Sequence, residues 1–248
     1  MRVDVFFGPH EIGAADMNGR VVAVIDVLRA STTIAAALAN GARAVIPFES
    51  ADEVIATSKS FERRDVRLAG ERRMLPIAGF DLGNSPLEFT REAVGGNTVL
   101  LTTTNGTVAL AAVSGARDTV VASYANYSPI LALLRSAARG GTDVSILCAG
   151  TDRHFSLEDA GCAGRYAAAV ARDFGDVRFN DAARSAMLIH ERYGDRIGDL
   201  FADAVHGQLL AGAGFAADLT ACGTIDGYPV VPIYQERQIT KLGPERER

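Results

Sequence analysis

The residues from Asp26 to Thr33 combine an acid, an arginine and three hydroxyls, directly after the apolar run Val21–Ile25. A helix N-terminus stabilises an anion through its free backbone N–H groups and its dipole. Arg29 adds a guanidinium suited to phosphate or carboxylate, and Asp26 is suited to hold a cation or to act as nucleophile or base. The turn therefore predicts a site for a metal ion and an oxyanion.

The same turn has a purely structural explanation. Ser31 or Thr32 would cap the helix that follows, and Arg29 would form a surface ion pair. Capping does not explain an acid at the very end of a strand. We therefore favour the functional interpretation of Asp26.

A second hydroxyl-rich turn, Thr102–Thr107, also lies between a strand and a helix. The segments that follow the two turns, TIAAALANGAR from Thr33 and TVALAAVSGAR from Thr107, are identical at six of eleven positions. This repeat predicts two strand-turn-helix units whose turns lie on the same edge of a sheet, where α/β proteins bind ligands. Gly106 would let an oxyanion reach the backbone amides, although an Asn-Gly pair also forms plain turns.

Further acids accompany glycines or begin a helix. Glu71 and Asp81 lie in glycine-containing stretches, and Glu158 begins a predicted helix capped by Ser156. Ser85 and Glu88 match a capping box, whereas Asn84 has no such explanation. The segment Thr151–His154 is a further candidate to line a pocket.

The atoms that could bind a metal ion are mostly oxygen atoms. The four histidines and three cysteines show no spacing typical of a zinc site. Carboxylates suit Mg²⁺, which takes one or two of them and completes its shell with water and substrate phosphate. The chemistry that the residues indicate is metal-assisted phosphoryl transfer, most simply hydrolysis.

Short apolar runs alternate with alanine-rich helical patterns, as in βαβ units. We expect an α/β fold with αβα layers and a mostly parallel or mixed sheet. Residues 1–248 are expected to form a single catalytic unit, and an internal boundary between two lobes, if present, is placed near residue 150. The runs predicted as strands are Val3–Phe7, Val21–Ile25, Ala44–Phe48, Val66–Leu68, Thr98–Leu101, Thr119–Ala122, Val144–Leu147 and Tyr228–Tyr234.

Composition limits the partners. The net charge is −5 with no long basic block, so nothing favours nucleic acid or an anionic membrane. No apolar run reaches the roughly 20 residues of a membrane span. The cysteine pattern favours a reducing compartment, and we expect a cytoplasmic protein that binds a small anionic phosphorylated substrate. A homo-oligomer is left open.

Several sequence blocks, taken in order, resemble the 2-phosphosulfolactate phosphatase family. They are IDVLRASTTIAAALANGA, GER at Gly70–Arg72, GFDLGNSPLEF, LTTTNGT, CAG and FSLED. The resemblance implies a Mg²⁺-dependent α/β phosphatase that converts (2R)-2-phospho-3-sulfolactate to (2R)-3-sulfolactate and phosphate, a step towards coenzyme M.

These arguments give one set of site residues. Asp26, Arg29 and Asp81 are the catalytic candidates, and Asp26, Glu71 and Glu158 are the expected Mg²⁺ ligands. The sequence leaves open whether Asp26 ligates the metal or attacks phosphorus. Leu28 stands where haloacid-dehalogenase-type phosphatases have a second Asp, which favours a metal-activated water. The residues expected to bind substrate or phosphate are Arg29, Ser31, Thr32, Asn84, Thr103, Thr104, Asn105, Gly106 and Thr107.

Two alternatives use the same turns. The first is a non-catalytic sensor or carrier of a small phosphorylated acid, which would bind its ligand without a metal. The second is an isomerase or lyase acting on a phospho-hydroxy acid, which would release no free phosphate.

Overall fold

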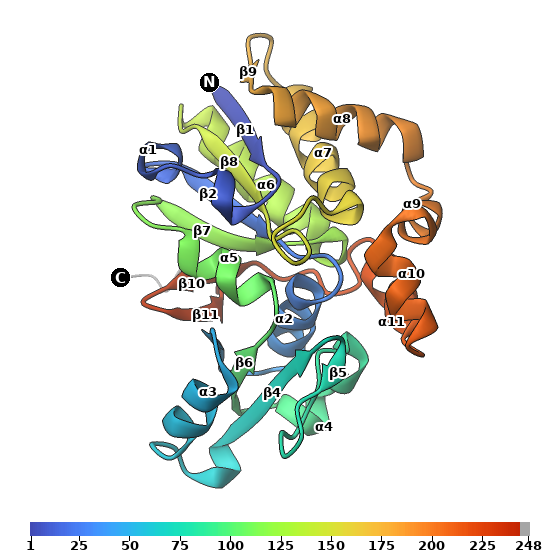
Figure 1. The fold of residues 1–248 in the computed structure, drawn as a ribbon. Coiled ribbons are helices and arrows are strands. Elements are labelled where there is room, and N and C mark those ends of the chain that lie inside the picture. Colours follow the sequence, from blue (N-terminus) through green and yellow to red (C-terminus); the bar gives the residue numbers. More distant parts are fainter. Residues whose placement is uncertain (244–248) are drawn as a thin grey trace.

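The computed structural model describes residues 1–243 and contains a mixed sheet of eleven strands with helices on both faces (Figure 1). The α/β layered fold expected from the sequence is confirmed. The strands are β1 (Arg2–Phe6), β2 (Val21–Ile25), β3 (Ala44–Phe48), β4 (Val66–Arg72), β5 (Leu75–Pro76), β6 (Thr98–Thr102), β7 (Asp118–Ala122), β8 (Val144–Cys148), β9 (Arg178–Phe179), β10 (Pro232–Gln235) and β11 (Gln238–Lys241).

The α-helices differ widely in length. They are α1 (Ala14–Met17), α2 (Ala30–Ala39), α3 (Ala51–Ser58), α4 (Arg91–Val94), α5 (Gly106–Ala112), α6 (Tyr127–Arg139), α7 (Leu157–Ala171), α8 (Asp181–Tyr193), α9 (Ile197–Asp203), α10 (Val205–Gly212) and α11 (Ala216–Gly223). Short 3₁₀ turns, among them Pro86–Glu88, connect some of the elements. None of the helices within residues 1–243 has the length and apolar character needed to cross a membrane.

The sheet consists of two parallel blocks separated by an antiparallel hairpin. Its order is β5-β4-β6-β3-β11-β10-β7-β2-β8-β1-β9. β4, β6 and β3 are parallel to one another, as are β7, β2, β8, β1 and β9. The hairpin β10–β11 pairs antiparallel with β7 on one side and with β3 on the other. Figure 1 shows β1, β2 and β8 above the hairpin and β4 and β6 below it.

The hairpin reverses the direction of one block relative to the other. Three successive antiparallel pairings separate β7 from β3, so β2 and β6 run in opposite directions and do not end at the same edge of the sheet, as the repeat had predicted for their turns. Sheet twist compensates for the reversal. Roughly 20–25° per strand over the five steps from β6 to β2 adds up to about 100–125°, which turns the carboxyl ends of both strands towards a common region.

Both faces of the sheet are buried, which explains the nearly continuous apolar character of its central strands. In β2, Val21, Ala23 and Ile25 pack into a core with helices α6 to α9. Val22 and Val24 point to the opposite face, into a core that contains α2 and α5. This second core also includes Val45 and Val99 of the other block. Helix α2 therefore packs in a core shared by the two blocks.

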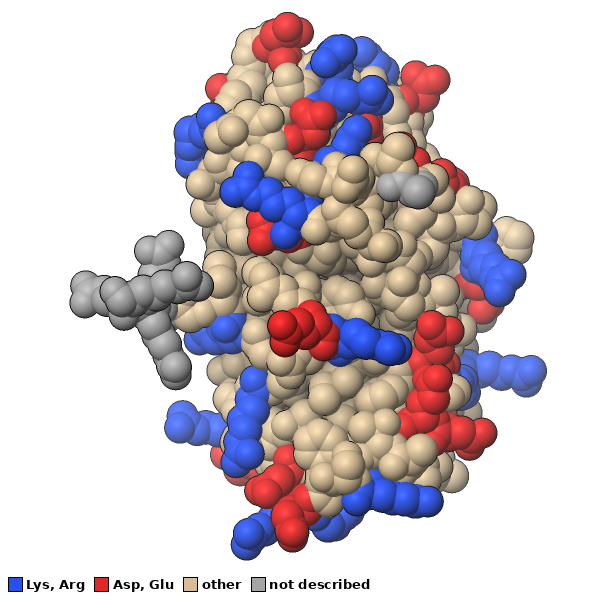
Figure 2. All heavy atoms as spheres, turned by 90° about the vertical axis from the view of Figure 1, so that its left-hand side faces the viewer, with Lys and Arg blue, Asp and Glu red and all other residues tan. Residues whose placement is uncertain are grey.

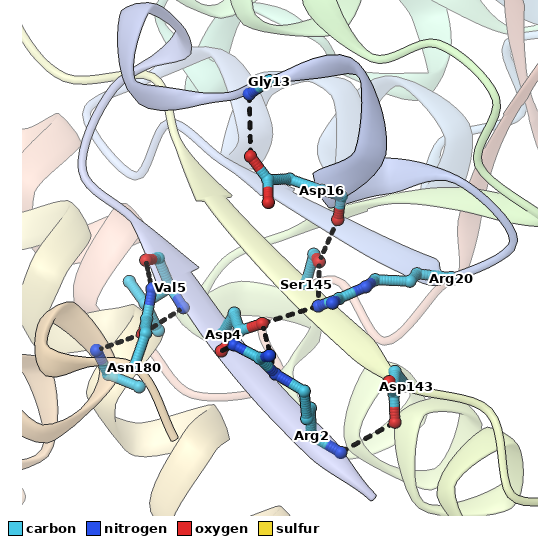
Figure 3. Close-up of polar contacts among 10 residues, drawn as sticks. Arg2, Asp4, Val5, Gly13, Asp16, Arg20, Asp143, Ser145 and Asn180 are labelled. Carbon is cyan, nitrogen blue, oxygen red and sulfur yellow. Dashed lines mark hydrogen bonds and ion pairs between the residues drawn. The ribbon is translucent and has the colours of Figure 1, made fainter. Parts of the chain in front are cut away.

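A polar network fixes β1 against its neighbours (Figure 3). Asp4 on β1 is buried and forms ion pairs with Arg20, at 2.7 Å, and with Arg2, at 3.2 Å. Arg20 also donates to the hydroxyl of Ser145 on β8. Asn180, the N-cap of α8, bonds both backbone polar groups of Val5. These contacts satisfy buried polar groups and hold α8 on β1.

Charged side chains of both signs are interspersed over the face drawn in Figure 2, with uncharged surface between them. This mixed pattern agrees with the modest net charge of the sequence.

Candidate active site

A cavity of about 590 Å³ lies where the carboxyl ends of β2, β4, β6 and β8 come together. Each of these strands contributes residues from the turn that follows it or from its last positions, and helix α10 contributes two more. The lining residues are Asp26, Leu28, Arg29, Glu71, Arg72, Arg73, Met74, Asn84, Thr103, Thr104, Asn105, Thr151, Asp152, His206 and Leu209.

The two hydroxyl-rich turns are in direct contact. A Cβ added to Gly106, the first residue of α5, would lie 2.7 Å from Oδ2 of Asp26 and 2.8 Å from Cβ of Ala30. Only glycine allows this approach of the second turn to the first. The predicted convergence of the turns is therefore confirmed.

Glu71 connects three parts of the cavity. Its Oε1 accepts hydrogen bonds from the backbone N–H and the hydroxyl of Thr104, both at 2.8 Å. Its Oε2 accepts the backbone N–H of Met74 at 2.9 Å. Since Glu71 is buried, these bonds fix its carboxylate beside the turn that follows β6.

Asp26 is the most strongly perturbed carboxyl group in contact with the cavity. It is 7% exposed, and its backbone N–H donates to the hydroxyl of Ser31 at 2.8 Å. Burial raises the pKa of Asp26 from 3.8 to about 7, and the negative charges of Glu71 and Glu158 add to the rise. A cation beside these carboxylates would relieve their repulsion and favour the ionised form of Asp26.

A second pair of acids lies at the start of α7. Oδ1 of Asp159 accepts the backbone N–H of Val27 at 2.8 Å, and Oδ2 accepts that of Gly150 at 3.2 Å. Burial raises the pKa of Asp159, and repulsion from Asp26 and Glu158 raises it further. Asp159 thus joins the turns after β2 and β8, a role that its position at a helix start did not reveal.

His206 brings α10 into the site. Its Nδ1 lies 3.2 Å from the hydroxyl of Thr151 and 3.8 Å from Oε1 of the buried Glu158. Burial lowers the pKa of His206, and the charge of Glu158 opposes this effect. The sequence did not predict His206 as a site residue, because the histidines were considered only as zinc ligands.

Arg29 lines the cavity, but its guanidinium is already engaged. Nη1 donates to Oδ2 of Asp218 at 2.6 Å, Nη2 donates to the carbonyl of Met74 at 2.9 Å, and the group lies 4.3 Å from the ring centre of Phe215. The structural alternative, in which Arg29 forms a surface ion pair, does not hold, since the Arg29 side chain is 2% exposed. The Leu28–Arg29 peptide bond is cis.

Three predicted phosphate ligands use their hydroxyls to build the turns. The Ser31 hydroxyl accepts from the backbone of Asp26, and those of Thr32 and Thr107 donate to the carbonyls of Val27 and Thr103. None of the three lines the cavity described above.

The predicted residues that do line the cavity from the turns are Thr103, Thr104 and Asn105. Asn84 lines it as well, and its buried Oδ1 has no hydrogen-bond partner among the described residues. Thr151 and Asp152 also contribute, and the backbone N–H of Asp152 donates to Oδ1 of Asn105 at 3.0 Å.

Asp81 lies away from this cavity. Its carboxylate pairs with Arg63 and accepts the backbone N–H of Leu68 at 2.8 Å. Ser85 does not cap a helix either, because its hydroxyl donates to Asp218 at 2.6 Å and a 3₁₀ turn follows it. Both residues have structural roles that the local glycine-rich pattern does not indicate.

Within residues 1–243, no three side chains of His, Cys, Asp or Glu are grouped closely enough to form a complete metal site by themselves. A metal bound here would take one or two carboxylates and obtain its remaining ligands from water and substrate.

Comparison with known proteins shows the family to which the chain is similar. The family model for 2-phosphosulpholactate phosphatase matches residues 6–237. A protein of Symbiobacterium thermophilum named probable 2-phosphosulfolactate phosphatase is 42% identical over 229 residues, covering 92% of this chain and 97% of the relative. Proteins with the same name from Caldanaerobacter subterraneus and Thermotoga petrophila are each 36% identical. They cover 90% and 93% of this chain, and 91% and 94% of their own lengths.

Proposed function

The chain belongs to the 2-phosphosulfolactate phosphatase family of phosphoric monoester hydrolases, and we propose that it acts with Mg²⁺ on a small anionic 2-phospho-hydroxy acid. The proposed substrate is (2R)-2-phospho-3-sulfolactate, which would give (2R)-3-sulfolactate and phosphate. The names of the relatives support this choice. We further propose a single catalytic unit, because residues from both sides of position 150 line the cavity. The cysteine pattern supports a cytoplasmic location.

The observation that carries the proposal is the environment of Asp26. A buried carboxyl with a pKa of about 7, repelled by Glu71 and Glu158, is poorly stabilised in its ionised form. Oxygen donors of this kind suit Mg²⁺. Asp26, with Glu71 or Glu158, would hold the ion. Bound Mg²⁺ would supply a Lewis acid for the phosphoryl group and a water of lowered pKa.

The chain itself would position the phosphoryl group. Thr103 lines the cavity, and its hydroxyl accepts the backbone N–H of Thr107 at 3.4 Å, which leaves its O–H to donate. Asn105 accepts a hydrogen bond through Oδ1, which leaves its Nδ2 to donate. Glu71 engages both donors of Thr104, so Thr104 would orient the turn rather than bind phosphate.

The test is a phosphate-release assay on 2-phospho-3-sulfolactate, 2-phospholactate and 2-phosphoglycolate, with Mg²⁺ and after chelation by EDTA. We expect phosphate release with Mg²⁺ and none after chelation. Tight binding without phosphate release, unaffected by EDTA, would instead establish the sensor. Conversion of substrate without free phosphate would establish an isomerase or lyase.

A further inference from the structure

Three arginines line the cavity, and two of them are engaged by the protein. Arg29 is held by Asp218 and the carbonyl of Met74. Arg72 donates to the carbonyls of Glu71, at 2.7 Å, and Glu49, at 3.2 Å. It also donates to the Thr102 hydroxyl. Among residues 1–243, no acceptor is found for the side chain of Arg73, the third arginine.

Arg73 occupies the tip of a tight hairpin. Arg72 pairs with Leu75 across β4 and β5, so Arg73 and Met74 form a two-residue turn. Their φ angles are 52° and 71°, in the left-handed region that such turns usually fill with Asn and Gly. A long charged residue in this region strains the backbone. Unusual backbone of this kind tends to occur at ligand-binding sites.

The backbone of the tip is fixed from two sides. The N–H of Met74 donates to Oε2 of Glu71, and its carbonyl accepts from Arg29. Both partners are buried. The hairpin therefore presents Arg73 at a defined position relative to the proposed metal ligand Glu71.

Charge in the cavity is graded by depth. The carboxylates of Asp26 and Glu71, which line the cavity, are buried, whereas Arg72 and Arg73 are exposed. A phosphoryl group bound at the deep carboxylates with Mg²⁺ would leave the rest of the substrate directed towards the arginines. A second anionic group on that part of the substrate would then lie near Arg73, the guanidinium that has no acceptor among residues 1–243.

We propose that Arg73 binds the second anionic group of the substrate, a carboxylate or sulfonate, and so selects phosphorylated acids over simple alkyl phosphates. This inference rests on the proposed phosphatase function. Arg73 is then a specificity residue that acts on substrate binding.

The test compares 2-phospholactate with isopropyl phosphate, which carries a methyl group in place of the carboxylate. For Arg73→Gln we expect kcat/KM on 2-phospholactate to fall about 10- to 100-fold, mainly through KM, as for the loss of a charge-assisted hydrogen bond. The value for isopropyl phosphate should change by less than about 3-fold, because that substrate offers Arg73 no charged partner. Arg73→Lys should retain part of the preference, because it keeps the charge without the planar fork.

Arg43→Gln is the matched control, since Arg43 is an exposed arginine outside the cavity and the change in charge is the same. It should leave both substrates unaffected. Equal losses on both substrates for Arg73→Gln, or no loss on either, would overturn the role of Arg73 while leaving the phosphatase function intact. A wild-type protein that releases no phosphate from any 2-phospho-hydroxy acid would overturn the function itself.

Discussion

Arg29 and Asp218 form a buried ion pair, with 2.6 Å between Nη1 and Oδ2 and 189 positions between the residues in the chain. Arg29 belongs to the turn after β2, and Asp218 lies on α11. The other oxygen of Asp218 accepts the hydroxyl of Ser85. This pair therefore anchors the C-terminal helices to the turn that carries Asp26.

Replacing Asp218 by Asn should destabilise the protein. The substitution leaves the Arg29 guanidinium buried without a counter-charge, which typically lowers the free energy of unfolding by about 3–5 kcal/mol. Urea unfolding at pH 7 measures the loss of unfolding free energy. Asp199→Asn is the control, because Asp199 pairs with Arg196 at the surface and such pairs contribute at most about 1 kcal/mol. Equal effects of the two substitutions would show that the buried pair contributes little.

Gly106→Ala should strongly reduce activity. The new methyl group would lie 2.7 Å from Oδ2 of Asp26, so the two turns would have to separate. Displacement of a catalytic group by about 1 Å can cost on the order of 100-fold in rate. The measurement is kcat/KM for phosphate release. Gly175→Ala, where a Cβ meets nothing within 4 Å, should behave as wild type. Full activity of Gly106→Ala would contradict the described contact.

Asp26 should make the metal-free protein less stable as pH rises. Its pKa is raised from 3.8 to about 7 in the folded state, so between these values the folded state binds more protons than the unfolded state. The free energy of unfolding should therefore fall from about pH 4 to pH 7, with a contribution from Asp26 of about 4 kcal/mol.

The comparison for this prediction is urea unfolding of wild type and Asp26→Asn in EDTA. The variant should be the more stable protein at pH 8, and the difference should shrink towards pH 4. Parallel pH profiles of the two proteins would show that the pKa of Asp26 is not raised.

Asp81→Asn should leave phosphatase activity close to that of wild type. Asp81 lies outside the cavity and pairs with Arg63, whose side chain is 66% exposed. Loss of this exposed pair should cost less than about 1 kcal/mol of unfolding free energy. The measurement is kcat and KM of wild type and Asp81→Asn with 2-phospho-3-sulfolactate. A large fall in kcat would restore Asp81 as the catalytic residue that the sequence suggested.

Local patterns predicted much of the fold because the strands that build the two blocks carry strong signals. The predicted bounds of β2 and β3, Val21–Ile25 and Ala44–Phe48, match the structure, and the helix capped by Ser156 spans Leu157–Ala171. The insertion of β10–β11 between the blocks was not predictable. It depends on pairing between the end of the chain and strands far away in sequence, for which no local pattern exists.

The same distinction between local patterns and long-range contacts applies to the site. The turns at Asp26 and Thr102–Thr107 are local features, and the repeat predicted that they lie together. It did not predict the antiparallel hairpin that separates their strands in the sheet. Asp218 and His206 were missed because they lie on helices whose relation to the site exists only in the folded chain. Arg29 was identified as functional, but its partner Asp218 could not be inferred from the sequence around it.

The most direct test of the proposed mechanism is phosphate release from 2-phospho-3-sulfolactate by wild type and Asp26→Asn over a range of Mg²⁺ concentrations. Wild type should release phosphate in proportion to bound Mg²⁺ and should release none in EDTA. Asp26→Asn should lose on the order of a thousandfold in kcat/KM, because it removes a carboxylate that holds the ion. Full Mg²⁺-dependent activity in Asp26→Asn would contradict the assignment.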